Sequence, residues 1–93
     1  MKPKSLEHVA LGRAIRELRR GAGISQEGLA DRSRLHRTYV GGIERGERNV
    51  SFGNLSKLAN ALAIRPSELI ARSESFLPAS DQQTDQECNP PGR

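Results

Sequence analysis

A short polar run at residues 36–38, His-Arg-Thr, carries side chains suited to reading the edge of a DNA base pair. The guanidinium of Arg37 can donate two parallel hydrogen bonds to O6 and N7 of guanine, which is worth roughly 1 to 3 kcal/mol of discrimination. Thr38 offers a hydroxyl group for a polar base edge and a methyl group for thymine. His36 and Tyr39 are further candidates with structural alternatives: His36 could cap a helix, and Tyr39 could pack at the domain edge with its hydroxyl near a phosphate.

The residues around this run predict the two helices that would position it. Apolar or small residues fall on one face of two short segments: Leu29, Ala30, Leu35, Val40 and Ile43. The first segment is expected to be a helix from about Gln26 to Ser33, and the second a helix from His36 or Arg37 to Gly46. Two short helices crossing at a tight turn, with a basic face outward, are typical of a helix-turn-helix, whose second helix enters the major groove.

The start of the first of these helices predicts a phosphate contact. Ser25 is a good N-cap, because its hydroxyl can accept from an unpaired backbone N–H in the first turn. Gln26 follows it, where free N–H groups and the helix dipole attract an anion. We therefore expect the Gln26 amide to hold a DNA phosphate; the alternative is a solvated first-turn residue.

Three more helices complete the expected all-α fold, a compact five-helix bundle. A first helix is predicted from about Leu6 to Arg20, because Leu11, Ile15 and Leu18 recur at helical spacing. A fourth helix follows the Ser51 cap, with an inward stripe expected to consist of Phe52, Leu55, Leu58, Ala59 and Leu62.

The fifth helix is expected to begin near Pro66, which suits a first helical turn. Its apolar residues Leu69 and Ile70 are expected at a dimer contact or at the edge of the core. A chain of 93 residues with 34% hydrophobic residues forms only a small core, so a further apolar patch buried between two copies would stabilise it. Homodimerisation is therefore expected.

Charge divides the chain into a basic domain and a polar tail. Residues 1–74 carry a balance of +6, and residues 75–93 sum to −2. All nine basic residues between positions 13 and 48 are arginine, which favours bidentate contacts with phosphates and guanine edges. We expect a DNA-binding domain over 1–74 and a disordered tail over 75–93, in which only Phe76 and Leu77 are able to dock.

The sequence offers little for catalysis, metal binding or membrane insertion. Cys88 is the single cysteine and has no partner at metal-ligand spacing, so no metal and no cofactor are expected. The histidines His8 and His36 do not form the pattern of a triad, and Glu27 with Asp31 is more typical of a solvated acidic edge than of an acid-base pair. No apolar run has transmembrane length and no secretion signal is recognisable, so a non-enzymatic, cytoplasmic protein is expected.

Three segments make the chain resemble the Cro/cI-type (XRE) helix-turn-helix family, whose members have a lambda-repressor-like fold. They are SQEGLA from position 25, HRTYVGGIERG from position 36 and NLSKLANALAI from position 54. The resemblance extends from about Leu6 to Arg72. The segment HRTYVGGIERGERN is also similar to that of restriction-modification controller proteins.

The resemblance implies roles for several residues. Gln26 matches a glutamine that binds phosphate, and Thr38 matches a base-reading position. Neutral and basic residues after the recognition helix match a loop that follows the sugar-phosphate backbone, and these are Arg45, Arg48, Asn49 and Ser51. Glu44 matches a glutamate that pairs with a basic residue of the first helix, here Arg19, so a structural ion pair is expected.

The sequence departs from the family pattern at two positions. Arg34 stands in the turn where glycine is usual, so a positive φ there would store strain on the order of 1 kcal/mol, or the turn would be slightly rearranged. Gly42 stands where relatives often have a long polar base reader, so it permits only a close approach of the backbone. Specificity is then expected from Arg37 and Thr38, with DNA shape supplying the rest.

The pattern as a whole predicts a sequence-specific transcriptional regulator that binds as a homodimer to a palindromic operator. Its half-sites would lie about one helical turn apart, roughly 34 Å. The alternative is an antitoxin or phage-type regulator whose polar tail engages a protein partner while the helical domain binds DNA.

Overall fold

The computed structural model describes residues 5–78, and all of its regular elements are helices. They are α1 (Leu6–Gly21), α2 (Gln26–Ser33), α3 (Arg37–Glu44), α4 (Phe52–Ala61) and α5 (Pro66–Glu74). The predicted five-helix, all-α fold is confirmed, and each helix begins where the sequence predicts it. None of the helices in the described part of the chain is long and apolar enough to cross a membrane.

Short polar side chains define where the helices start. The hydroxyl groups of Ser5, Ser25 and Ser51 each accept a hydrogen bond from the backbone N–H three residues later, at 3.1, 2.9 and 3.1 Å. Such a cap satisfies one of the backbone donors that a first helical turn leaves unpaired. The α2 start and the α4 start therefore follow directly from local sequence, as predicted from Ser25 and Ser51.

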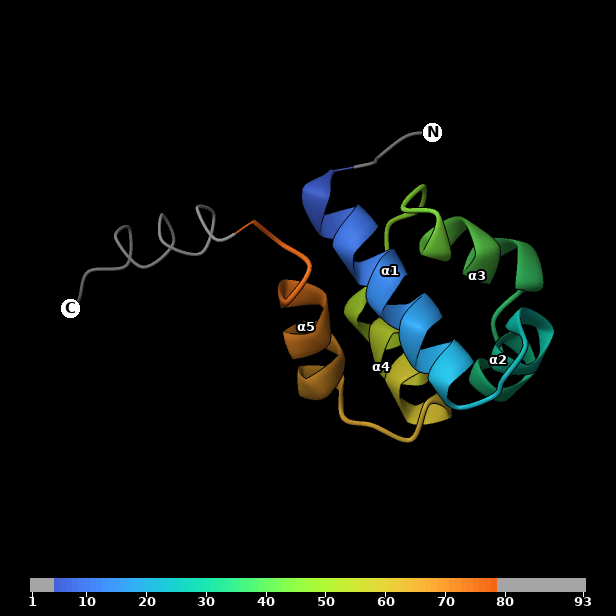
Figure 1. Ribbon diagram of the computed structural model, residues 1–93. Helices are drawn as coiled ribbons and strands as arrows, with labels where there is room; N and C mark the ends of the chain where they lie inside the picture. The colour runs from blue at the N-terminus through green and yellow to red at the C-terminus, as the bar shows by residue number, and fades with distance from the viewer. Residues whose placement is uncertain (1–4, 79–93) are drawn as a thin grey trace.

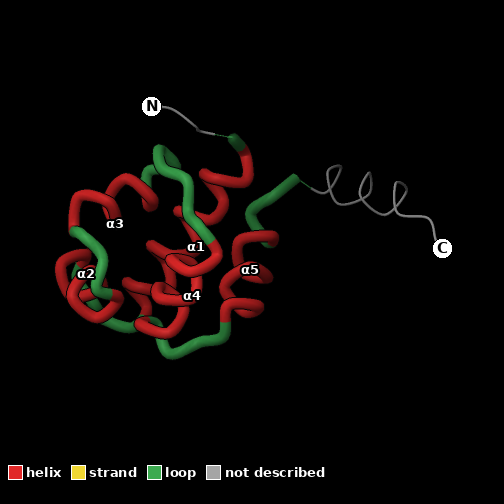
Figure 2. Tube along the Cα trace, turned by 180° about the vertical axis from the view of Figure 1, so that it is seen from behind, coloured by secondary structure: helices red, strands yellow, loops and turns green. Residues whose placement is uncertain are grey.

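In Figure 1, α1 lies in front of α4, with α5 on one side and α2 and α3 on the other; α1 packs against α5 and α3, and α4 packs against α2 and α5. The view from behind gives the same order (Figure 2). This arrangement encloses one hydrophobic core, whose largest fully buried side chains are Ile15, Leu29, Val40, Ile43, Leu58 and Leu69. The core thus draws on all five helices, and it fixes the angle at which α3 leaves α2.

Two glycines allow α1 and α3 to approach closely. A Cβ atom on Gly12 would lie 2.3 Å from the carbonyl oxygen of Ile43, so the α1 backbone rests directly on the end of α3. Gly46 has φ +78° and packs against Val9. Its N–H donates to the Ile43 carbonyl oxygen at 3.0 Å, and the next N–H donates to the Gly42 carbonyl oxygen at 2.8 Å, which together form a Schellman motif. The predicted role of Gly46 in ending the recognition helix is confirmed.

Two expectations about apolar residues are wrong. Phe52 is 72% exposed rather than part of the core stripe, whereas Leu55, Leu58, Ala59 and Leu62 are buried as expected. Because helical side chains lean toward the N-terminus, a residue in the first turn of α4 extends past the core edge. Leu69 is fully buried in the monomer and cannot be a dimer contact, while its neighbour Ile70 remains 41% exposed.

The segment after α5 folds back onto α1. Phe76 is half-buried against the core, and the guanidinium carbon of Arg13 lies 4.5 Å from the centre of its ring. Docking at Phe76 matches the expectation for this residue. The remainder of the predicted tail, 79–93 with Cys88, lies outside the described residues.

Candidate nucleic-acid interface

The turn between α2 and α3 keeps a left-handed residue despite the absence of glycine. Arg34 has φ 62° and ψ 33°, and the N–H of Leu35 donates to the carbonyl oxygen of Ala30 at 3.1 Å. The turn is therefore not rearranged, and Arg34 carries the strain expected of a side chain in this region. Behind it, Leu29, Val40 and Ile43 are buried, so the polar face of α3 is turned outward.

The first turn of α3 presents its candidate readers to solvent. His36, Arg37 and Thr38 are all exposed. The Nδ1 atom of His36 accepts a hydrogen bond from the Thr38 N–H at 3.1 Å, so the capping alternative for His36 is realised. Arg37 and Thr38 are therefore the residues of this turn whose side chains are exposed and have no capping role.

Arg37 is paired with an acid of the neighbouring helix. Its Nη1 forms an ion pair with Oε2 of Glu27 in the first turn of α2. Both side chains are more than 60% exposed, so water screens this pair and it contributes little to stability. A carboxylate nonetheless occupies one side of the guanidinium that would read a guanine.

The hydroxyl group of Tyr39 forms its hydrogen bonds within the protein. Its hydroxyl donates to the carbonyl oxygen of Asn49 at 2.7 Å and accepts from Nδ2 of Asn54 at 3.1 Å. The guanidinium carbon of Arg48 lies 6.0 Å from the centre of the same ring. Tyr39 therefore holds the loop between α3 and α4 in place, and the geometry supports its structural role over base reading.

A buried carboxylate links α1, α2 and α3. The expected ion pair between Arg19 and Glu44 is present and bidentate: Nε donates to Oε2 at 2.7 Å, and Nη2 donates to Oε1 at 3.1 Å. The side chains are 11% and 3% exposed. The same guanidinium donates to the Ile24 carbonyl oxygen at 3.0 Å, which fixes the loop before α2.

Gln26 forms a hydrogen bond within the fold. Its Nε2 donates to Oε1 of Glu44 at 3.0 Å, which orients the side chain and uses one of the two amide N–H donors. This bond was not foreseen, because it depends on the approach of α2 to the end of α3. The first turn of α2 still lies at the surface, with Ser25 and Glu27 exposed and Gln26 half-buried.

The loop after α3 brings together the remaining candidate phosphate ligands. Arg45 and Arg48 are exposed, and Nε of Arg45 donates to Oε1 of Glu47 at 3.1 Å. Oδ1 of Asn49 lies 2.6 Å from Nε2 of His8 on α1. The Ser51 hydroxyl is committed to the α4 cap but remains on the surface.

Gly42 has a packing role that the sequence did not reveal. A Cβ atom at this position would lie 2.7 Å from Cγ of Arg48, so the stem of that arginine lies directly over the glycine. The place of a long side chain on α3 is therefore taken by one from the following loop.

Comparison with known proteins identifies the family. The helix-turn-helix family matches residues 15–69, and the chain belongs to the XRE type of this family. The restriction-modification controller protein C.AhdI from Aeromonas hydrophila is 55% identical, and the match covers 70% of this chain and 98% of the solved chain with a TM-score of 0.69. The control protein C.BamHI from Bacillus amyloliquefaciens is 45% identical over 60 residues, which are 63% of this chain and 74% of that protein.

A related structure contains DNA. The controller protein C.Esp1396I, solved bound to a 19 base pair duplex, is 29% identical with a TM-score of 0.72. The match covers 77% of this chain and 96% of the solved chain. The predicted resemblance to the XRE family and to restriction-modification controller proteins is thus confirmed.

Proposed function

We propose that this chain is a controller-type transcriptional regulator that binds a palindromic operator as a homodimer. The observation that carries the proposal is the exposed first turn of α3, with Arg37 and Thr38 outward, on a helix-turn-helix that is 55% identical to a restriction-modification controller protein. C.Esp1396I is described as a tetramer on its natural 35 base-pair operator, which supports a symmetric assembly on DNA. The antitoxin alternative depends on the tail, and nothing in residues 5–78 favours it.

Base reading is assigned to Arg37 and Thr38. When α3 enters the major groove, the Arg37 guanidinium leaves Glu27 and donates to O6 and N7 of a guanine. The exchange is feasible because the ion pair is exposed and weak. Thr38, held at the helix start by the His36 cap, meets the neighbouring base pair.

Phosphate contacts are assigned to both edges of α3. On one side, the α2 start offers backbone N–H groups beside Gln26, in the geometry that binds anions at helix N-termini. On the other, Arg45, Arg48, Asn49 and Ser51 line the loop that Tyr39 holds in place. Such contacts set register and affinity, and they carry no sequence information.

The dimer contact is assigned to the surface around Ile70. This side chain borders a partly open hollow of about 420 Å³ whose other apolar lining residues include Leu11, Val50, Leu55 and Leu77. It replaces the expected contact through Leu69, which lies inside the core. A second copy covering this hollow would remove from water an apolar surface that the small monomer leaves exposed.

Selection from a randomised DNA pool tests the function. Wild type is compared with Arg37→Ala and Arg45→Ala at two salt concentrations, with Arg65→Ala as a control for loss of one exposed arginine away from α3. We expect a palindromic motif that loses definition at one position with Arg37→Ala. With Arg45→Ala every sequence weakens alike, and the salt slope falls by about one. If wild type enriches no motif, the protein is not a sequence-specific regulator.

A further inference from the structure

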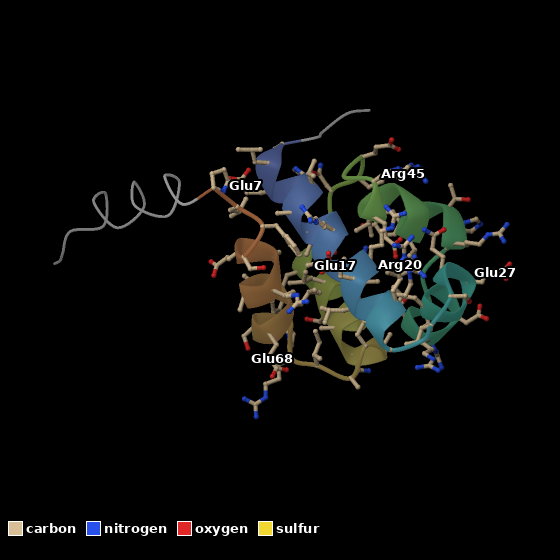
Figure 3. The ribbon with its side chains drawn as sticks, viewed as in Figure 1. Glu7, Glu17, Arg20, Glu27, Arg45 and Glu68 are labelled. Atoms are coloured by element: carbon tan, nitrogen blue, oxygen red, sulfur yellow. The ribbon has the colours of Figure 1, made fainter. Side chains whose placement is uncertain are left out.

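Two polar hollows lie along the seam where α1 crosses α3. One, of about 410 Å³, is lined by Val9, Arg13, Arg16, Glu17, Arg20 and Glu44. The other, of about 300 Å³, is lined by Arg16, Arg19, Gln26, Glu44 and Arg45. Arg16 and Glu44 line both, so the two hollows adjoin, and together they are called the α1–α3 groove below. Figure 3 shows Arg20 beside α1 and Arg45 beside α3, with nitrogen-rich side chains between these helices.

This α1–α3 groove carries an excess of positive charge. Five arginines line it against two glutamates. Both glutamates are already neutralised: Glu44 by Arg19, and Glu17 by Arg13 at 3.7 Å and Arg72 at 3.6 Å. The groove therefore has no free carboxylate among the described residues that line it.

Two of the arginines make no side-chain interaction with the described residues of the protein. Arg16 and Arg20 are one helical turn apart on the same face of α1, and both are exposed. The side chain of neither residue forms a hydrogen bond, an ion pair or a ring contact within residues 5–78. Arg13 and Arg19 on the same helix differ, because the first stacks on Phe76 and the second holds Glu44. Guanidinium groups left free in a cationic groove are suited to bind phosphate oxygens.

We propose that Arg16 and Arg20 bind DNA backbone phosphates that lie outside the base-read half-site. The inference rests on the proposed function, and it extends the contact surface from α2 and α3 onto α1. The position of the groove favours DNA as its occupant, since one end opens beside Gln26 and Arg45, where the backbone of a half-site is already expected. A strand leaving that end passes Arg16 first and Arg20 next, at successive points along the duplex flank.

The test compares two duplexes. The minimal duplex ends at the outermost base pair that shows a base preference, and the extended duplex adds roughly one helical turn of arbitrary sequence at each end. Full-length wild type is measured on both, beside the double variant Arg16→Gln with Arg20→Gln. The matched control is Arg32→Gln with Arg65→Gln, which removes the same charge from exposed arginines outside the groove. Thermal unfolding of all three proteins checks that the fold is unchanged.

Wild type should bind the extended duplex more tightly than the minimal one and with a steeper salt dependence. The Arg16 and Arg20 double variant should lose this difference, and its slope of log affinity against log salt should fall by about 0.9 for each arginine. Its preferred base sequence should stay unchanged, because phosphate contacts are blind to sequence. The control should retain the full advantage of the extended duplex.

Other outcomes overturn the proposal in distinguishable ways. If wild type recognises the minimal operator but gains nothing from the flanks, the inference fails and the proposed function stands. If wild type prefers neither duplex over random DNA, the proposed function fails as well. If both double variants lose the same affinity, the loss reflects the change in net charge alone, and the proposal of specific contacts by Arg16 and Arg20 fails. A last outcome is that the Arg16 and Arg20 double variant keeps the advantage of the extended duplex but loses the ability of wild type to bind poly-glutamate. In that case the groove binds an acidic protein partner and not DNA.

Discussion

Glu44 places a nearly enclosed carboxylate at the junction of three helices. Burying this charge is unfavourable for the folded state unless hydrogen-bond and charge partners surround it. Arg19 and Gln26 direct three N–H donors at its two oxygens. No buried side-chain nitrogen or oxygen in the described part of the chain lacks a hydrogen-bond partner. Removing Arg19 would leave this nearly enclosed carboxylate without an opposite charge, with Gln26 as its remaining side-chain donor.

We expect Arg19→Met to lower the free energy of unfolding by about 3 to 5 kcal/mol, because the buried Glu44 carboxylate then loses its charge partner. The double variant Arg19→Met with Glu44→Leu should recover a large part of this loss, since it removes both charges and keeps apolar volume. Urea denaturation followed by circular dichroism measures both. Equal losses in the single and double variants would contradict this account of the pair.

Glu27 forms an ion pair with Arg37, the guanidinium that we propose reads a guanine. We expect Glu27→Gln to bind the operator about 1.4- to fivefold more tightly, in keeping with the roughly 0.2–1 kcal/mol of an exposed ion pair. The matched control is Asp31→Asn, one turn further along α2, which removes an acid of the same helix that does not contact Arg37. Fluorescence anisotropy at fixed salt gives both affinities.

The control separates a specific effect from a general one. If Asp31→Asn raises the affinity as much as Glu27→Gln, the gain comes from net charge alone. If Glu27→Gln weakens binding, Glu27 orients Arg37 for the base rather than competing with it.

At the scale of the helices, the contact of α1 with α3 depends on a missing side chain. Gly12→Ala would place a Cβ atom 2.3 Å from the Ile43 carbonyl oxygen and 2.7 Å from that of Glu44. Both contacts are with backbone atoms, which can move only at a high energetic cost. We therefore expect the free energy of unfolding to fall by about 1 to 3 kcal/mol or more, which exceeds the gain in helix propensity. Thermal melting measures it.

Gly21 provides the control on the same helix. A Cβ atom there would meet nothing within 4 Å, so Gly21→Ala should be neutral or stabilise by up to about 1 kcal/mol. If the two alanine variants melt alike, the crossing of α1 over α3 is looser than the structure indicates.

The positions of the helices were predictable because their signals are local. Ser25 and Ser51 identify helix starts, and Gly46 identifies the end of α3 through its positive φ. Arg34 shows the limit of such signals, since the fold imposes a left-handed residue where the local sequence offers no glycine. Packing of the two helices determines this turn more strongly than the preference of its residue.

The errors concern features that depend on distant parts of the chain. Helical spacing groups Phe52 with Leu55, yet only the arrangement of all five helices decides that the first turn of α4 extends beyond the core. The full burial of Leu69 depends in the same way on how α5 packs against α1 and α4. The bond from Gln26 to Glu44 joins residues 18 positions apart, and no local pattern encodes it.

At the scale of the whole molecule, substitutions at the exposed Ile70 and at the buried Leu69 allow dimer assembly and monomer stability to be tested separately. Ile70→Glu should yield a folded monomer with lower operator affinity, because the charge enters the surface assigned to the dimer. Leu69→Ala should instead lower the free energy of unfolding by about 2 to 5 kcal/mol, since it leaves a cavity in the core. Sedimentation velocity and thermal melting distinguish the two effects.

Phe52→Ser is the control for this prediction. Phe52 is more exposed than Ile70 but does not line the hollow around it, so its replacement should leave the association state unchanged. A monomeric Phe52→Ser protein, or a dimeric Ile70→Glu protein, would move the dimer contact away from α5.

The packing of Arg48 over Gly42 also constrains how the preferred operator could change over evolution. A side chain introduced at position 42 alone would collide with the Arg48 stem, whose Cγ atom lies 2.7 Å from the position of the new Cβ. A variant that gains a base-reading side chain at position 42 alone would therefore have a displaced loop between α3 and α4. Its proposed contacts with the DNA phosphates would be weaker. Paired codon changes at 42 and 48 avoid that intermediate, so a library aimed at new operators should vary these two positions together.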